Sequence, residues 1–135
     1  MRFMMFMYPG IEADAESWQP SADDVAAMSK YNEELTQAGV LLALDGLRSP
    51  VDGARVRFSG GTPTVTDGPF AEAKEVAGGY WVIQAGSKEE AVEWASRCPA
   101  AEGDMIEVRR VFEMEDFSED VQEAPELSER PPEQT

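Results

Sequence analysis

The chain has 135 residues, a length typical of one domain with a substantial hydrophobic core. Its 27 acidic and 11 basic residues give a formal net charge of −16 with no basic cluster, so we expect neither nucleic acid nor an anionic membrane as a partner. The absence of histidine excludes a histidine-based catalytic triad and removes the commonest metal ligand, and we expect no metal or cofactor.

The lone cysteine and the apolar start of the chain bear on location. Cys98 has no partner for an internal disulfide, and its neighbours Trp94 and Pro99 indicate a structural thiol packed at a helix end. The apolar run at residues 3–8 is too short for a signal-peptide core with its flanks, and Pro9 ends it. We therefore expect a soluble, cytoplasmic protein.

The first third of the chain predicts a strand, a helix and a second strand. Residues 2–8 are apolar on both faces of the predicted strand. A helix is expected from Ser21, with Asp24 completing a capping box, and Gly39 stands where a left-handed residue ends a helix. Its apolar stripe, at spacings of three and four, consists of Val25, Met28, Tyr31, Leu35 and Ala38. Residues 40–44 form the second strand.

The middle of the chain predicts a hairpin. Residues 54–59 alternate between apolar and polar, which is typical of a half-exposed strand. Gly60 and Gly61 form a turn into a short partner strand at residues 62–66.

The last third repeats the strand–helix–strand order. Residues 79–85 are again apolar on both faces, which favours a central position in a sheet. Ser87 and Glu90 predict a capping box at the start of a second helix, and Pro99 stops that helix. Residues 105–112 alternate, as an edge strand would.

This order predicts an α+β fold, a ferredoxin-like split βαβ with an inserted hairpin. Two helices cover one face of such a sheet. The strands at residues 2–8 and 79–85 are apolar on both faces, so the uncovered face needs a partner. We expect a homodimer in which two sheets pack face to face.

The end of the chain is strongly acidic. Residues 113–135 hold nine of the 27 acids and one base, and we expect an acidic, disordered tail over residues 118–135. Phe112, Met114 and Phe117 are apolar exceptions that would anchor the first part of this segment on the body or on a neighbouring subunit.

A nine-residue stretch at residues 67–75, with the sequence DGPFAEAKE, resembles the signature of the DGPF family of YCII-related proteins. It departs from the family pattern at Ala73, where threonine is usual. Further similarity includes Gly78-Gly79-Tyr80 and the run from Glu107 to Phe117. The resemblance covers residues 1–117 and implies a domain with a dimeric α+β barrel fold.

The same resemblance implies little about chemistry. A His–Asp pair has been proposed as the active site of some YCII-type proteins, and here Asp67 is the aspartate candidate without a histidine. Members are often encoded near extracytoplasmic-function sigma factors, which implies a regulatory or stress-response context.

Four residues are candidates for a site. Asp67 is either a turn cap that fixes its loop or a carboxylate at the mouth of a pocket, acting as a general base or ligand contact. Lys74 belongs to an ion-pair set with Glu72 and Glu75 or binds an acidic group of a substrate. Tyr8 and Tyr80 are core residues or line a small apolar pocket, and we take both as candidate ligand contacts.

Two functions from different classes follow. The first is a small-molecule-binding or enzyme-like dimer with a pocket near Asp67. The second is a non-catalytic dimeric regulatory or binding module, in which the motif serves the architecture and the acidic tail or the pocket recognises a partner. Direct contact with a sigma factor is a third, supported by gene context in the family.

Overall fold

The structure, a computed structural model, describes residues 1–11, 19–70 and 76–123. Two 3-10 turns occupy Pro50–Asp52 and Met114–Asp116. The strands and helices, in chain order, are β1 (Arg2–Tyr8), α1 (Ala22–Gln37), β2 (Leu41–Gly46), β3 (Ala54–Ser59), β4 (Thr62–Asp67), β5 (Gly79–Gln84), α2 (Lys88–Ser96), β6 (Met105–Arg110) and α3 (Glu119–Gln122).

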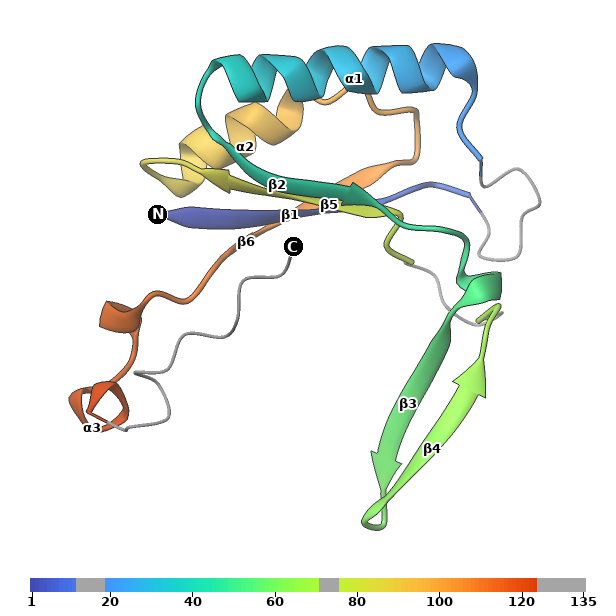
Figure 1. The fold of residues 1–135 in the computed structure, drawn as a ribbon, viewed down its shortest axis with the longest axis vertical. Coiled ribbons are helices and arrows are strands. Elements are labelled where there is room, and N and C mark those ends of the chain that lie inside the picture. Colours follow the sequence, from blue (N-terminus) through green and yellow to red (C-terminus); the bar gives the residue numbers. More distant parts are fainter. Residues whose placement is uncertain (12–18, 71–75, 124–135) are drawn as a thin grey trace.

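The main sheet has four strands in the order β2-β5-β1-β6, and all neighbouring strands are antiparallel. Helices α1 and α2 cover one of its faces (Figure 1). The expected α+β fold of ferredoxin-like type is confirmed, with the two doubly apolar strands β1 and β5 at the centre and β6 at an edge. The dimer and the barrel remain predictions.

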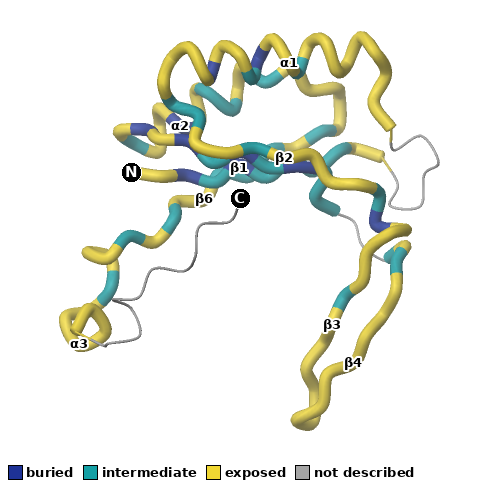
Figure 2. Tube along the Cα trace, viewed as in Figure 1, coloured by how far each residue is buried: buried dark blue, intermediate teal, exposed yellow. Residues whose placement is uncertain are grey.

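The hydrophobic core lies between the helices and the sheet. Met5, Leu35 and Ile83 are fully buried there, and most of the buried residues in Figure 2 lie in this layer. Pro50, in the 3-10 turn before the hairpin, is buried outside it. Because side chains alternate along a strand, every second residue of β1 and β5 faces the helices. The strand residues that build this side of the sheet are Phe3, Met5, Met7, Leu41, Leu44, Trp81, Ile83, Ile106 and Val108.

The helix ends show how sequence sets the elements. Ser21 and Asp24 form the reciprocal capping box that the sequence predicts, and Gly39 has a φ of 72° just beyond α1. At α2 the Ser87 hydroxyl accepts from the Glu90 N–H, as expected. The return bond differs, because the Glu90 carboxylate accepts from the Gly86 N–H, 2.8 Å away, one residue before the cap.

The opposite face of the main sheet, which we call the open face, has an apolar centre. Its central side chains are those of β1 and β5 that alternate with the core residues: Met4, Phe6, Tyr8, Tyr80 and Val82. All five are half-buried. Polar side chains from β6 and β2 lie on the same face at its margins, among them Glu107, Arg109 and Asp45.

Two segments project on the side of the open face (Figure 1). One is the β3–β4 hairpin, a separate two-stranded sheet at one end of the molecule, which we call the hairpin arm (residues 54–67). The other follows β6 at the opposite end, and we call it the C-terminal arm (residues 111–123). Both are largely exposed (Figure 2).

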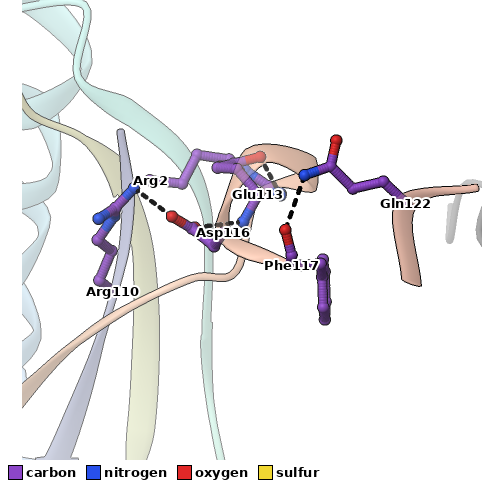
Figure 3. Close-up of polar contacts among 6 residues, drawn as sticks. All are labelled: Arg2, Arg110, Glu113, Asp116, Phe117 and Gln122. Atoms are coloured by element: carbon purple, nitrogen blue, oxygen red, sulfur yellow. Dashed lines mark hydrogen bonds and ion pairs between the residues drawn. The ribbon is translucent and has the colours of Figure 1, made fainter. Parts of the chain in front are cut away.

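Two ion pairs attach the C-terminal arm to the sheet. Arg2 of β1 contacts Glu113 at 2.8 Å, and Arg110 of β6 contacts Asp116 at 2.9 Å (Figure 3). Phe112 and Phe117 stack on each other with ring centroids 4.9 Å apart, and Phe112 stays 68% exposed. The predicted boundary after residue 117 stays a prediction. Helix α3 lies beyond it, and residues 124–135 lie outside the described part of the chain.

Among the described residues, no helix is both long enough and apolar enough to cross a membrane bilayer.

Candidate functional site

A small cavity of about 170 Å³ lies where α1 crosses the ends of the central strands. This volume suits one six-membered ring or a short chain, since a cavity of about 150 Å³ holds benzene in an engineered protein. Its lining is mostly apolar and comes from α1, β1, β2 and β5: Met7, Met28, Asn32, Leu44, Asp45, Gly46, Gly78, Gly79, Tyr80 and Trp81.

The side chain of Asn32 is the oriented polar group of this cavity. Its Oδ1 accepts a hydrogen bond from the indole Nε1–H of Trp81 at 2.8 Å. An indole nitrogen only donates, so this bond fixes which end of the amide faces Trp81. The Nδ2 group, with two N–H donors, takes no part in this bond and is open to solvent, because no buried side-chain nitrogen or oxygen of the described residues lacks a partner. The cavity therefore offers donors to an acceptor such as a carbonyl or carboxylate oxygen.

Trp81 is itself held rigidly. It is 5% exposed and meets Tyr31 edge to face, with ring centroids 5.9 Å apart. Tyr31 in turn donates from its hydroxyl to the carbonyl of Trp94 in α2, 2.7 Å away. Aromatic packing and two hydrogen bonds thus fix the indole, and through it the amide of Asn32.

Tyr80 and Asp45 are also among the residues that line the cavity, and their side chains form a polar pair on the open face. They are direct cross-strand neighbours on β5 and β2, and the Tyr80 hydroxyl donates to Asp45 Oδ2 at 2.7 Å. This hydrogen bond raises the pKa of Tyr80, so the phenol stays protonated at neutral pH. A phenol in this state is a donor and not a base.

Backbone contacts at Gly78 and Gly79 close the end of the cavity. The N–H of Gly78 donates to Met7 O at 2.7 Å, and its carbonyl accepts from Leu47 at 2.9 Å. A β-carbon on Gly79 would lie 3.1 Å from the carbonyl oxygen of Asp45. The glycine pair therefore allows β1, β5 and the end of β2 to approach closely.

The loop that carries the DGPF-like signature begins at the base of the hairpin arm. Gly68 donates its N–H to Gly53 O at 2.9 Å, and a β-carbon on Gly68 would overlap the carbonyl oxygen of Pro50. Phe70 lies beneath the guanidinium of Arg55, 4.0 Å from the ring centroid. Gly68 therefore joins the end of β4 to the segment between β2 and β3, and Phe70 contacts the first strand of the hairpin arm.

The predicted site residues do not gather at one place. Asp67 ends β4 opposite Ala54, is exposed, and is not among the described residues that line the cavity. Tyr8 lies on the open face beside Phe6, with ring centroids 6.5 Å apart. Tyr80 reaches both the open face and the cavity, and Lys74 lies outside the described residues. The roles proposed for these residues remain predictions.

Asn32 and Asp45 are the cavity residues that sequence reasoning missed. Asn32 follows Tyr31 on the buried side of α1. A polar residue next to the apolar stripe is the sequence signal that could have marked it as a site residue. Asp45 sits at the end of β2 and reads in sequence as a turn former. Their partners, Trp81 and Tyr80, are 49 and 35 residues away, so only the fold joins them.

A wider groove of about 540 Å³ runs between α2 and β6. Cys98 lies in its wall, half-buried, and burial raises the pKa of its thiol to about 11. The thiol is therefore protonated at neutral pH, as a structural cysteine would be. Among residues 1–11, 19–70 and 76–123, no three metal-ligating side chains gather into a possible metal site.

Comparison with known proteins gives two matches. A family model described as the YCII-related domain matches residues 1–115. The chain is also 31% identical over 86 residues to an uncharacterized protein of Rhizobium meliloti, an alignment that covers 62% of this chain and 69% of that protein.

Proposed function

This chain belongs to the YCII-related domain family, and we propose that it is a small-molecule-binding protein that works as a homodimer. The observation that carries the proposal is the cavity under α1 with the Asn32 amide fixed at its wall. An apolar pocket with a few oriented polar groups is the usual form of a ligand site. The ligand expected is a single ring or short chain that carries a carbonyl or carboxylate oxygen.

Binding rather than catalysis is favoured by the polar groups of the cavity. The amide of Asn32 does not titrate, and the phenol of Tyr80 is held protonated by Asp45. The amide N–H groups bind and orient an acceptor, and the Tyr80 proton is already given to Asp45, whereas a general base needs a pKa close to the working pH. The same observation supports the regulatory module as the second candidate, in which the bound molecule acts as a signal.

The homodimer is supported by the open face. Its centre is apolar and its margin carries charged side chains, the arrangement found in protein interfaces. Phe6→Glu would place a charge at the middle of that face. We expect wild type to sediment as a species of twice 14.8 kDa at micromolar concentration, and Phe6→Glu as a monomer. Val25→Glu, on the exposed side of α1, is the matched control.

Ligand binding is tested by thermal shift with a panel of single-ring and short-chain carboxylates and ketones. A compound at ten times its Kd stabilises the folded state by about 1.4 kcal/mol, which raises Tm by roughly 4–8 °C for a domain of this size. Asn32→Asp is the informative variant. It keeps an oxygen for the Trp81 indole and replaces the amide donors with a second carboxylate oxygen, so the shift should disappear.

Asp67→Asn separates the cavity from the signature loop. We expect this variant to keep the thermal shift of wild type, because Asp67 is exposed at the end of β4. Loss of the shift in Asp67→Asn, with retention in Asn32→Asp, would place the site at Asp67 instead. No shift with any compound in wild type would contradict the binding proposal.

A further inference from the structure

The hairpin arm presents an apolar face that nothing in the described chain covers. Its register places on one face the apolar residues Ala54, Val56, Phe58, Pro63 and Val65, with the carboxylate of Asp67 at the base of the arm. Phe58 is 81% exposed and Val65 64% exposed. An isolated two-stranded hairpin is at best marginally stable in water, so a covering surface would stabilise this arm.

The other face of the hairpin arm is basic. Arg55 and Arg57 lie there, opposite Thr66 and Thr64. Arg55 stacks on Phe70, and Arg57 forms no ion pair with a described residue. The arm thus combines an apolar face with positive charge in a protein whose net charge is −16.

The C-terminal arm has the complementary character. Its exposed apolar side chains are Phe112, Met114 and Val121. Glu113 and Asp116 are taken up by Arg2 and Arg110 of the sheet, as Figure 3 shows. The remaining acids form no ion pair with a described residue: Glu115, Glu119, Asp120 and Glu123.

The two arms lie at opposite ends of the molecule and project on the same side (Figure 1). Within one chain they are therefore kept apart. Two sheets that pack through their open faces are related by a two-fold axis that lies in the plane between them. Two perpendicular directions of this axis give the two limiting arrangements. An axis along the line of sight of Figure 1 places each hairpin arm beside the partner's C-terminal arm. A horizontal axis in the plane of the figure places each hairpin arm beside the partner's hairpin arm.

Charge distinguishes these two arrangements. Hairpin against hairpin brings Arg57 towards its own copy, and C-terminal arm against C-terminal arm gathers acids. Like charges placed together oppose association, and opposite charges favour it. We propose that in the homodimer each hairpin arm packs against the C-terminal arm of the second copy, with Arg57 facing the acids of residues 115–123. This inference rests on the proposed homodimer and adds the direction of its two-fold axis and the contact between a hairpin arm and the partner's C-terminal arm, which we call the clasp.

The test uses two charge-reversed full-length chains. Arg57→Glu makes the hairpin arm acidic, and the fourfold variant Glu115→Arg/Glu119→Arg/Asp120→Arg/Glu123→Arg makes the C-terminal arm basic. All five positions are exposed and outside the core, so the variants should fold, which circular dichroism checks. We expect each variant alone to dimerise about tenfold more weakly than wild type or worse in sedimentation equilibrium, because both clasps of its dimer become repulsive.

Mixing the two variants gives the decisive measurement. In the mixed dimer each clasp joins opposite charges again, so native mass spectrometry should show the heterodimer in excess over either homodimer. Lys30→Glu, on the exposed side of α1, makes the same change of charge away from both arms and should dimerise like wild type.

Three other outcomes overturn the proposal, each differently. If both charge variants dimerise like wild type, the arms do not meet. If mixing gives no excess of heterodimer and Arg57→Gln, which removes the charge, dimerises more tightly than wild type, the hairpin arms pack on each other. If both variants are weakened and mixing restores nothing, the charges do not meet across the two chains. A wild-type chain that is monomeric would instead remove the underlying homodimer, which the open-face variant Phe6→Glu tests separately.

Discussion

The substitution Gly68→Ala tests the role of the signature loop most sharply. The added β-carbon would overlap the carbonyl oxygen of Pro50 and lie 2.6 Å from its carbonyl carbon, both of which belong to the backbone. A backbone contact cannot be relieved by a rotamer change, so the loop must shift. The hydrogen bond from Gly68 to Gly53 O, now 2.9 Å, is lost with that shift.

The expected cost follows from these two effects. Overpacking costs about 1–3 kcal/mol and a lost hydrogen bond about 1 kcal/mol, so we expect the free energy of unfolding to fall by roughly 2–4 kcal/mol. Urea unfolding followed by Trp fluorescence measures it. The matched control is Gly46→Ala, where a β-carbon meets no atom within 4 Å and φ is not left-handed. That variant should be neutral or stabilised by about 0.4–1 kcal/mol. Equal stability of the two alanine variants would refute the reasoning.

Three further predictions concern the core, the C-terminal arm and the thiol. Leu35→Ala, at a position with 0% exposure, should lower the free energy of unfolding by about 2–5 kcal/mol in urea titrations. The hydrogen bond from Arg2 lowers the pKa of Glu113, so its contribution to stability is present above the ordinary carboxyl pKa of 4.5 and is lost as pH falls through the lowered value. In Arg2→Gln, NMR titration should return that pKa towards 4.5, and an unchanged pKa would contradict the ion pair. Because burial raises the pKa of Cys98 to about 11, iodoacetamide should alkylate it at pH 8 roughly a hundredfold more slowly than a free thiol or slower still. A rate like that of a small thiol would contradict this.

Local signals in the sequence were enough for most of the fold. The capping residues Ser21 and Asp24 and the left-handed Gly39 fix α1 within its own segment. The doubly apolar runs at residues 2–8 and 79–85 identify the central strands β1 and β5, because apolar side chains gather at the middle of both faces of the sheet, away from its polar margins. These features act over a few residues and can be read without a structure.

The direction in which the arms project could not be read in this way. Phe112 and Phe117 suggested an apolar anchor on the body or on a neighbouring subunit, which stays a prediction, and within the described chain Arg2–Glu113 and Arg110–Asp116 attach the C-terminal arm to the sheet. The first of these pairs joins residues 111 positions apart. Its partners become visible only when β1 and β6 are known to be neighbours.

The cavity was hidden for the same reason. Its amide donor lies on α1 and is oriented by an indole on β5, so the site depends on how a helix crosses the sheet and not on any motif. The motif itself proved informative about architecture. The position of Gly68 against the Pro50 carbonyl gives a physical reason for a glycine there, while the role of Asp67 is still open to test.

The most direct test of ligand binding at the cavity is an NMR titration that follows the indole N–H of Trp81. This proton is hydrogen-bonded to Oδ1 of Asn32, whose Nδ2 group is the proposed ligand contact. The variant Trp81→Phe assigns its signal among the three tryptophans. With a compound that raises Tm, the Trp81 indole signal should shift and saturate at the concentration given by the thermal data. An indole signal that stays fixed while the compound stabilises the protein would contradict binding in this cavity.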